Sequence, residues 1–151
     1  MIQGVCVKSL KAHCDERGRL MEILRSDDEL FEKFGQIYMT TAYPGVVKAW
    51  HFHHRQTDHF AVVYGMAKIV LFDPRDGSST RGVVNEFFAG DFQPLLIKIP
   101  PLVYHGYKCI SEGETIVLNM PTELFNYDQP DEHRIAPDDP GIPYDWARHD
   151  G

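Results

Sequence analysis

The sequence has no apolar run long enough to span a membrane, and its first residues, MIQGVCVKSLKAH, lack the charged-then-apolar pattern of a secretory signal. Its three cysteines are odd in number and widely spaced, which does not suit a disulfide framework. Basic residues are also scarce, because 15 Lys and Arg against 22 Asp and Glu give a formal net charge of −7. We therefore expect a cytoplasmic protein that contacts no membrane and has no basic face for nucleic acid.

The sequence does contain a series of short apolar stretches separated by turn residues. With 151 residues, 43% of them hydrophobic and 25% charged, the chain has the size and composition of a single soluble domain over 1–151. The stretches are rich in β-branched and aromatic residues and cover 5–10, 19–25, 36–42, 45–53, 59–65, 67–73, 83–88, 95–100, 103–110 and 114–119. This spacing is typical of a β-sandwich or barrel, so we predict an all-β fold.

Two segments depart from the strand pattern. One short helix is predicted from Ser26 to Gly35, since Ser26 can cap its first turn, Glu29 can complete the capping box and Gly35 can end it. The segment 121–151 is rich in Pro and Asp, so we predict an irregular arm there. Aromatic residues are spaced through this arm, and we expect it to be ordered against the domain or a partner subunit.

Residues 45–65, GVVKAWHFHHRQTDHFAVVYG, concentrate imidazoles within what otherwise looks like two consecutive strands. Strand side chains alternate between faces, so His51 and His53 point the same way. The spacing from Gly45 through His51, His53 and Asp58 to Gly65 resembles the first cupin motif, with Asp58 where Glu is usual. Part of the second cupin motif is present at Pro100 and His105. The resemblance to the cupin superfamily implies a jelly-roll barrel.

Five motifs in order along the chain support a more specific resemblance. They are Asp15-Glu16-Arg17-Gly18 with Glu22; GVVKAWH at 45–51; DPRDGSSTRG at 73–82; Ile99-Pro100 with His105-Gly106-Tyr107 and Ser111-Glu112; and Asn126-Tyr127 with Pro130, Gly141-Ile142 and Trp146. Together they are similar to motifs of the dTDP-4-dehydrorhamnose 3,5-epimerase family. That family has a cupin fold and needs no metal, and its members are homodimers that act on a nucleotide-linked sugar.

The resemblance implies a role for each candidate site residue. His51 matches the base that removes a proton next to the C4 ketone of the sugar, and such a base needs an oriented imidazole and a pKa near neutrality. Asp58 can orient an imidazole, and a tyrosine can act as the acid on the opposite face. The predicted catalytic residues are His51, His53, Asp58 and Tyr107, with Tyr127 and Tyr104 as further sources of the acid. The predicted substrate-binding residues are Lys48, His105, Asn119, Tyr127 and Arg75.

The sequence also departs from the family pattern. Asp58 stands where the family has a lysine, Asn119 stands where it has the acidic tyrosine, and its LSxKD segment has no counterpart. Three alternatives therefore stay open. The pair His51 and His53 resembles the HxH pair of sugar 3,4-ketoisomerases. His51, His53, Asp58 and His105 could instead bind a divalent Mn, Fe, Ni or Zn ion in a metal-dependent cupin, although no cofactor is favoured. The third alternative is a sugar-binding cupin without turnover.

Overall fold

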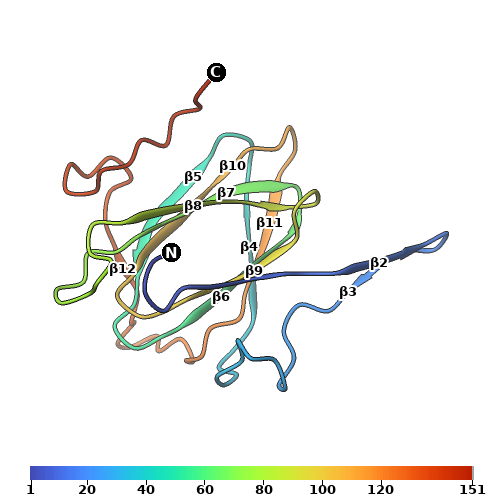
Figure 1. Cartoon of the computed structure of the whole chain (residues 1–151), viewed down its shortest axis with the longest axis horizontal. Coiled ribbons are helices and arrows are strands. Elements are labelled where there is room, and N and C mark those ends of the chain that lie inside the picture. Colours follow the sequence, from blue (N-terminus) through green and yellow to red (C-terminus); the bar gives the residue numbers. More distant parts are fainter. Residues whose placement is uncertain (151) are drawn as a thin grey trace.

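Two five-stranded antiparallel sheets pack face to face in the computed structural model, which describes residues 1–150 (Figure 1). The first sheet has the order β1-β9-β6-β11-β4 and the second β12-β5-β10-β7-β8. The first comprises β1 (Cys6–Ser9), β9 (Leu95–Ile99), β6 (Asp58–Tyr64), β11 (Thr115–Asn119) and β4 (Tyr38–Ala42). The second comprises β12 (His133–Arg134), β5 (Val47–Phe52), β10 (Tyr104–Cys109), β7 (Met66–Phe72) and β8 (Val84–Gly90). The prediction of an all-β fold is confirmed.

The main core lies between the two sheets, where alternate side chains of facing strands meet. Phe60 and Val62 of β6 pack there with Ile69 and Leu71 of β7 and with Ile97 of β9, all nearly inaccessible to solvent. Burial of this many large apolar side chains is the main source of stability for such a sandwich. Because successive side chains of a strand point to opposite faces, the strand positions decide which side chains face the interior. The same alternation places the site histidines between the sheets.

The C-terminal arm is ordered and packs on the outer face of the second sheet. Trp146 and Ile142 from the arm join Trp50 of β5 and Val70 of β7 in a separate apolar cluster. This cover explains why β7 is buried on both faces. The arm also contributes β12, which pairs with β5 and brings residues 131–134 to the mouth of the barrel.

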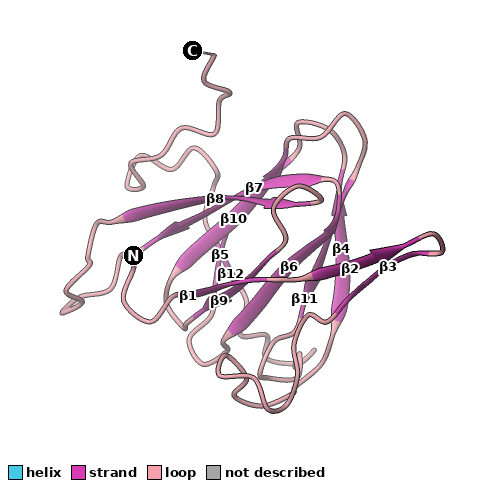
Figure 2. Cartoon of the chain, turned by 45° about the vertical axis from the view of Figure 1, so that its right-hand side comes forward, coloured by secondary structure: helices cyan, strands magenta, loops and turns pink. Residues whose placement is uncertain are grey.

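The helix predicted from Ser26 to Gly35 is wrong: residues 1–150 contain no helix, and this segment forms turns (Figure 2). Besides turn hydrogen bonds of its own, the segment uses backbone groups to contact distant parts of the chain. His59 Nε2 lies 2.9 Å from the Leu30 carbonyl oxygen, and the Gly35 amide donates to the Pro121 carbonyl at 3.0 Å. A Cβ at Gly35 would lie 2.5 Å from the Glu123 backbone, so this glycine permits a close approach of two segments and does not end a helix.

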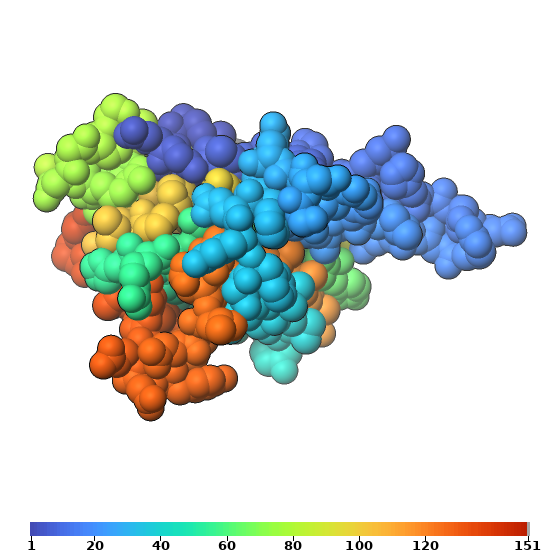
Figure 3. Space-filling model, turned by 90° about the horizontal axis from the view of Figure 1, so that it is seen from below, coloured from blue at the N-terminus to red at the C-terminus, as the bar shows by residue number. Residues whose placement is uncertain are grey.

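The two remaining strands, β2 (Ala12–Asp15) and β3 (Gly18–Met21), pair only with each other. They form a hairpin that projects from the body of the molecule, at the right of Figure 3. Within residues 1–150 the structure has no helix long and apolar enough to cross a membrane.

Candidate active site

A cavity of about 880 Å³ lies between the sheets, open at the end where the arm returns to the barrel. Side chains from both sheets and from the arm line it. Those that matter for the chemistry are Tyr38, Thr40, Lys48, His51, His53, Gln56, Phe60, His105, Tyr107, Glu132 and Arg134. A partly polar cavity of this size suits a small organic ligand.

His51 projects into the cavity from β5 and is held by the arm. Register pairs His51 with Arg134 of β12, which places the preceding Glu132 beside the ring. Glu132 Oε1 lies 3.2 Å from His51 Nδ1, and Arg134 Nε donates to the same carboxylate oxygen at 2.8 Å. Desolvation and the nearby His105 lower the pKa of His51, while Glu132 opposes them. The imidazole is therefore oriented through Nδ1 and is neutral at physiological pH, as a general base requires.

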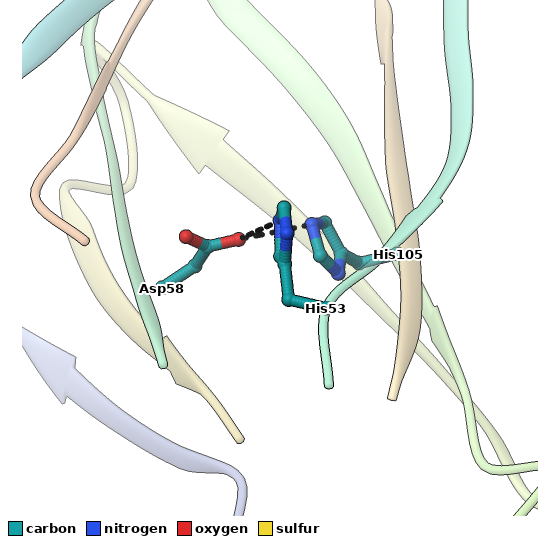
Figure 4. Close-up of side chains that lie close together, drawn as sticks. All are labelled: His53, Asp58 and His105. Carbon is teal, nitrogen blue, oxygen red and sulfur yellow. Dashed lines mark ion pairs between the residues drawn. The ribbon is translucent and has the colours of Figure 1, made fainter. Parts of the chain in front are cut away.

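A second, deeper group joins His53, Asp58 and His105 (Figure 4). Asp58 Oδ2 lies 3.1 Å from His53 Nε2 and 3.2 Å from His105 Nε2. Burial alone would raise the pKa of Asp58, but its contacts with His105 and His53 outweigh this and hold the pKa far below its ordinary value. Burial likewise works to lower the pKa of His53, and the contact with Asp58 outweighs it, so that this pKa is raised. The group is a buried ion pair close to the base but separate from it.

The other oxygen of Asp58 belongs to a chain of amide hydrogen bonds. Gln56 Nε2 donates to Asp58 Oδ1 at 2.7 Å, and Asn119 Nδ2 donates to the same oxygen at 2.9 Å. Asn119 Nδ2 also donates to the hydroxyl oxygen of Tyr38 at 2.9 Å. A continuous polar network thus runs from the buried ion pair to the cavity wall.

The same three residues fit a divalent metal ion by their chemistry. His53 Nδ1 contacts the Asp131 carbonyl and His105 Nδ1 the Val103 carbonyl at 3.1 Å, which leaves both Nε2 atoms free to act as ligands. Asp58 Oδ2 is buried without a hydrogen bond of standard geometry, and all three donor atoms lie within 4.8 Å of one another. Two imidazoles and a carboxylate suit Zn, Fe, Mn or Ni. His51 is not a member of this three-residue group.

Lys48 and Tyr107 form another wall of the cavity. Lys48 Nζ donates to Thr40 Oγ1 at 3.1 Å, and the Tyr107 hydroxyl shares a hydrogen bond of 3.1 Å with the same oxygen. Burial raises the pKa of Tyr107. Gly106 lies between the site residues of β10, where a Cβ would come within 2.3 Å of Ala49 Cβ. The glycine therefore lets β10 and β5 approach closely enough to bring His105 near His51.

The structure brings most of the sequence-predicted residues together, but the histidines have two different carboxylate partners. Lys48, His51, His53, His105 and Tyr107 line the cavity, Asp58 and Asn119 lie directly behind them, and Tyr127 is on the rim with 87% of its surface exposed. Asp58 contacts His53 and His105, whereas Glu132 contacts His51. Tyr104 packs against Phe52 and Phe72 outside the barrel.

Arg75 lies outside the cavity. Its guanidinium donates to Asp73 through Nε at 2.8 Å and to the Gln3 carbonyl through Nη2 at 2.7 Å. Ser78 and Thr80 donate to the same carboxylate, so the DxRxxSxTxG pattern builds a surface turn within this chain.

Sequence reasoning missed several residues of the site, among them Glu132, Gln56 and Tyr38. Glu132 lies in the arm, for which the sequence predicts no regular structure, and Gln56 lies in the loop before β6. Tyr38 lies in the stretch 36–42, whose pattern predicts only a strand. Only the strand register could have identified Tyr38, because it pairs Tyr38 with Asn119 across β4 and β11.

The chain is similar to proteins of surface and glycan polysaccharide synthesis. Residues 13–133 match a family model described as the polysaccharide biosynthesis C-terminal domain. The chain is 42% identical over 97% of its length to the spore coat polysaccharide biosynthesis protein SpsL of Bacillus subtilis (strain 168), covering 97% of that protein. It is 40% identical to the probable low-salt glycan biosynthesis epimerase Agl13 of Haloferax volcanii, with 96% of this chain and 94% of that protein aligned. A solved structure of a dTDP sugar isomerase from Desulfovibrio desulfuricans G20 superposes with a TM-score of 0.93 at 32% identity, covering 99% of this chain and 94% of that chain.

Proposed function

This chain belongs to the polysaccharide biosynthesis C-terminal domain family, within the epimerase cupins that its motifs resemble, and we propose that it epimerises a nucleotide-linked 4-keto sugar with His51 as base. The cupin barrel and the isomerase class predicted from the sequence are both confirmed by these similarities. A dTDP-linked 4-keto-6-deoxyhexose is the first substrate to try, since structural neighbours are described as epimerases of such sugars.

The observation that carries this proposal is the orientation of His51. Its Nδ1 faces the Glu132 carboxylate, and no hydrogen bond to Nε2 is formed within residues 1–150, so Nε2 is available at the cavity. A neutral imidazole held in this way can remove the proton on the carbon next to a ketone. Lys48, on the same strand as His51, supplies a cation in the same cavity for the developing enolate oxygen or for a phosphate of the nucleotide.

Solvent isotope exchange tests the proposal. In heavy water the wild-type protein is expected to introduce deuterium next to the C4 ketone, as seen by mass spectrometry, and to invert that carbon, as seen by NMR. His51→Asn is expected to lose both. His13→Asn, an exposed histidine in the β2–β3 hairpin, is the matched control and is expected to behave as wild type. Absence of exchange by the wild-type protein with dTDP- and GDP-linked 4-keto-6-deoxyhexoses would refute the proposal.

The product of the same reaction separates the epimerase from the other sugar-directed alternatives. A 3,4-ketoisomerase would also exchange protons but would move the carbonyl group from C4 to C3, which the carbon-13 NMR spectrum reports. A sugar-binding cupin without turnover would bind the nucleotide sugar and leave it unlabelled.

The buried group supports a metal-dependent cupin as a second candidate, because Asp58 Oδ2 has two imidazole nitrogens beside it and no standard hydrogen bond. A divalent ion held by His53, Asp58 and His105 would polarise a sugar oxygen as a Lewis acid. Elemental analysis of protein purified without added metal tests this candidate. About one equivalent per chain, lost together with thermal stability on chelation, favours the metal; stability unaffected by chelator and a metal content near zero refute it.

We also propose a homodimer. β4 is an edge strand of its sheet, and Met39 on it and Ile37 just before it expose 61% and 54% of their surface. Exposed apolar side chains on an unpaired edge are a common site of association. Light scattering coupled to gel filtration is expected to give twice the chain mass of 17.3 kDa; a monomer at micromolar concentration would contradict this.

A further inference from the structure

Epimerisation needs a proton donor on the face of the sugar opposite the base. In the family that the motifs resemble this donor is a tyrosine, and Asn119 stands at its position in this sequence. An amide cannot serve as the acid. We propose that Tyr38, on the strand next to Asn119, is the proton donor of this enzyme. This inference rests on the proposed epimerase function and adds a catalytic residue to it.

Strand positions place Tyr38 across the cavity from the base. Tyr38 begins β4 in the first sheet, whereas His51 belongs to β5 in the second sheet, and both side chains line the same cavity. A sugar ring bound between the sheets therefore presents one face to each residue. Glu132, the partner of His51, is also near enough to contribute to the raised pKa of Tyr38.

Asn119 positions the phenol and leaves its proton free for donation. The two residues are direct cross-strand partners, and the Asn119 amide donates to the Tyr38 oxygen at 2.9 Å. Because the amide nitrogen can only donate, it does not use the hydroxyl proton of Tyr38. No other hydrogen bond of this hydroxyl is formed within residues 1–150, so its proton is available to the cavity.

Electrostatics support the same role. Burial, followed by the charge of Asp58, raises the pKa of Tyr38 to about 12, so the hydroxyl is fully protonated at neutral pH. After donation the Asn119 amide stabilises the tyrosinate, an effect that acts against the rise. An enolate carbon is basic enough to take a proton from such a phenol.

The proposed step balances without a cofactor. His51 takes the proton as the carbon–hydrogen bond breaks, and the electron pair moves to the C4 oxygen. The enolate then forms a new carbon–hydrogen bond with the Tyr38 proton on the opposite face, and the carbonyl is restored. Tyr38 regains a proton from water, and His51 returns its proton to water.

The other tyrosines near the site are less suited. Tyr107 extends from the same sheet as His51, and its hydroxyl is already paired with Thr40. Tyr127 lies on the rim with 87% of its surface exposed, against 42% for Tyr38, and Tyr104 packs outside the barrel. Tyr107 is therefore the rival that the experiment must exclude.

Exchange and inversion, measured in one reaction in heavy water, distinguish the acid from the base. The substrate is a dTDP-4-keto-6-deoxyhexose, and dTDP affinity measured by calorimetry controls for the integrity of the binding site. In Tyr38→Phe, His51 can still remove the proton and return a deuteron to the same face. We expect inversion to fall by about 100-fold or more while deuterium exchange stays within about fivefold of wild type. Tyr64→Phe, at the exposed end of β6, is the matched control and should match wild type in both.

Each other outcome refutes a defined statement. Inversion by Tyr38→Phe at a rate near wild type, or selective loss of inversion in Tyr107→Phe, would overturn the assignment of Tyr38 and leave the epimerase function intact. Equal loss of exchange and inversion in Tyr38→Phe would also overturn it, since it would place the residue in binding or deprotonation. Failure of the wild-type protein to exchange any proton would overturn the epimerase function itself.

Discussion

Replacing Asp58 by Asn should destabilise the protein strongly in acid and weakly in alkali. The oxygen of the introduced amide would still accept the hydrogen bonds that Gln56 and Asn119 donate to Asp58 Oδ1. Its NH₂ group would face the two Nε2 atoms of His53 and His105, both of which can accept when the imidazole carries its proton on Nδ1. The introduced amide can thus hydrogen-bond to both histidines while they are neutral, and it cannot stabilise either imidazole once that imidazole is charged.

The direction of this pH dependence of stability follows from the raised pKa of His53. In wild type, a folded pKa above the unfolded value stabilises the protein below about pH 6.5, and this contribution is lost as the pH rises through the folded pKa. The depressed pKa of Asp58 adds to the free energy of unfolding above about pH 4, and this contribution stays constant from there to alkaline pH. Without the carboxylate, burial opposes protonation of His53, so the variant loses stability as the pH falls.

The magnitude comes from the burial of the pair, since Asp58 is 1% and His53 8% exposed. Removing one partner of a buried ion pair costs about 3–5 kcal/mol, which is the expected loss at pH 5.5. At pH 9 the loss should be about 1 kcal/mol, the value of an ordinary hydrogen bond. Urea unfolding of chelator-treated protein, followed by the fluorescence of the buried Trp50 and Trp146, measures both.

Asp73→Asn is the matched control. Asp73 is equally buried, and Arg75, followed by Ser78 and Thr80, holds its pKa far below the ordinary range. Because arginine does not titrate between pH 5.5 and 9, the loss of stability in this variant should be the same at both pH values. A loss for Asp58→Asn that is equal at the two pH values, or larger at pH 9, would refute the account of the buried group.

Three further substitutions test the geometry of the site. Glu132→Gln removes the charge that raises the pKa of His51, so the acid limb of the pH–rate profile should move to lower pH and kcat should fall by roughly 10-fold to 100-fold; an unchanged profile would show that Glu132 does not act on the base. Gly106→Ala places a carbon 2.3 Å from a side chain of β5 and should cost about 1–3 kcal/mol in urea unfolding, whereas Gly113→Ala, with no atom within 4 Å of the new carbon, should cost far less. Lys48→Met keeps the aliphatic stem and removes the cation, so kcat/KM should fall by roughly 10-fold at unchanged stability; normal steady-state kinetics would contradict a role for the cation.

The sequence predicted the strands well because their signal is local. Short runs of β-branched and aromatic residues between turn residues, such as 45–53, 59–65 and 103–110, favour extended backbone locally, and those stretches became β5, β6 and β10. The helix failed for the opposite reason. The capping residues Ser26 and Glu29 are a local signal, but the segment's backbone groups instead meet the side chain of His59 on β6 and the carbonyl of Pro121, both distant in sequence.

The site was predictable where it lies on regular strands and unpredictable where it lies on the arm. Strand alternation placed His51 and His53 on one face, and the resemblance to the cupin motifs added His105. A two-residue strand such as β12 has no pattern of its own, and its identity depends on β5, with which it pairs. Glu132 could therefore not be recognised as the partner of His51, and Asp58 was the nearest carboxylate in sequence.

The pairing of β12 with β5 has a consequence for the order in which the enzyme becomes competent. Every strand of the two sheets other than β12 is complete by residue 119, so a chain emerging from the ribosome can assemble its barrel, and His51 within it, before residues 131–134 exist. The base gains its carboxylate partner only when the arm folds back over the mouth of the barrel. Orientation of the base is thus the last part of the site to be synthesised, and a chain truncated before the arm would lack both the carboxylate partner of His51 and the apolar cover of Trp50.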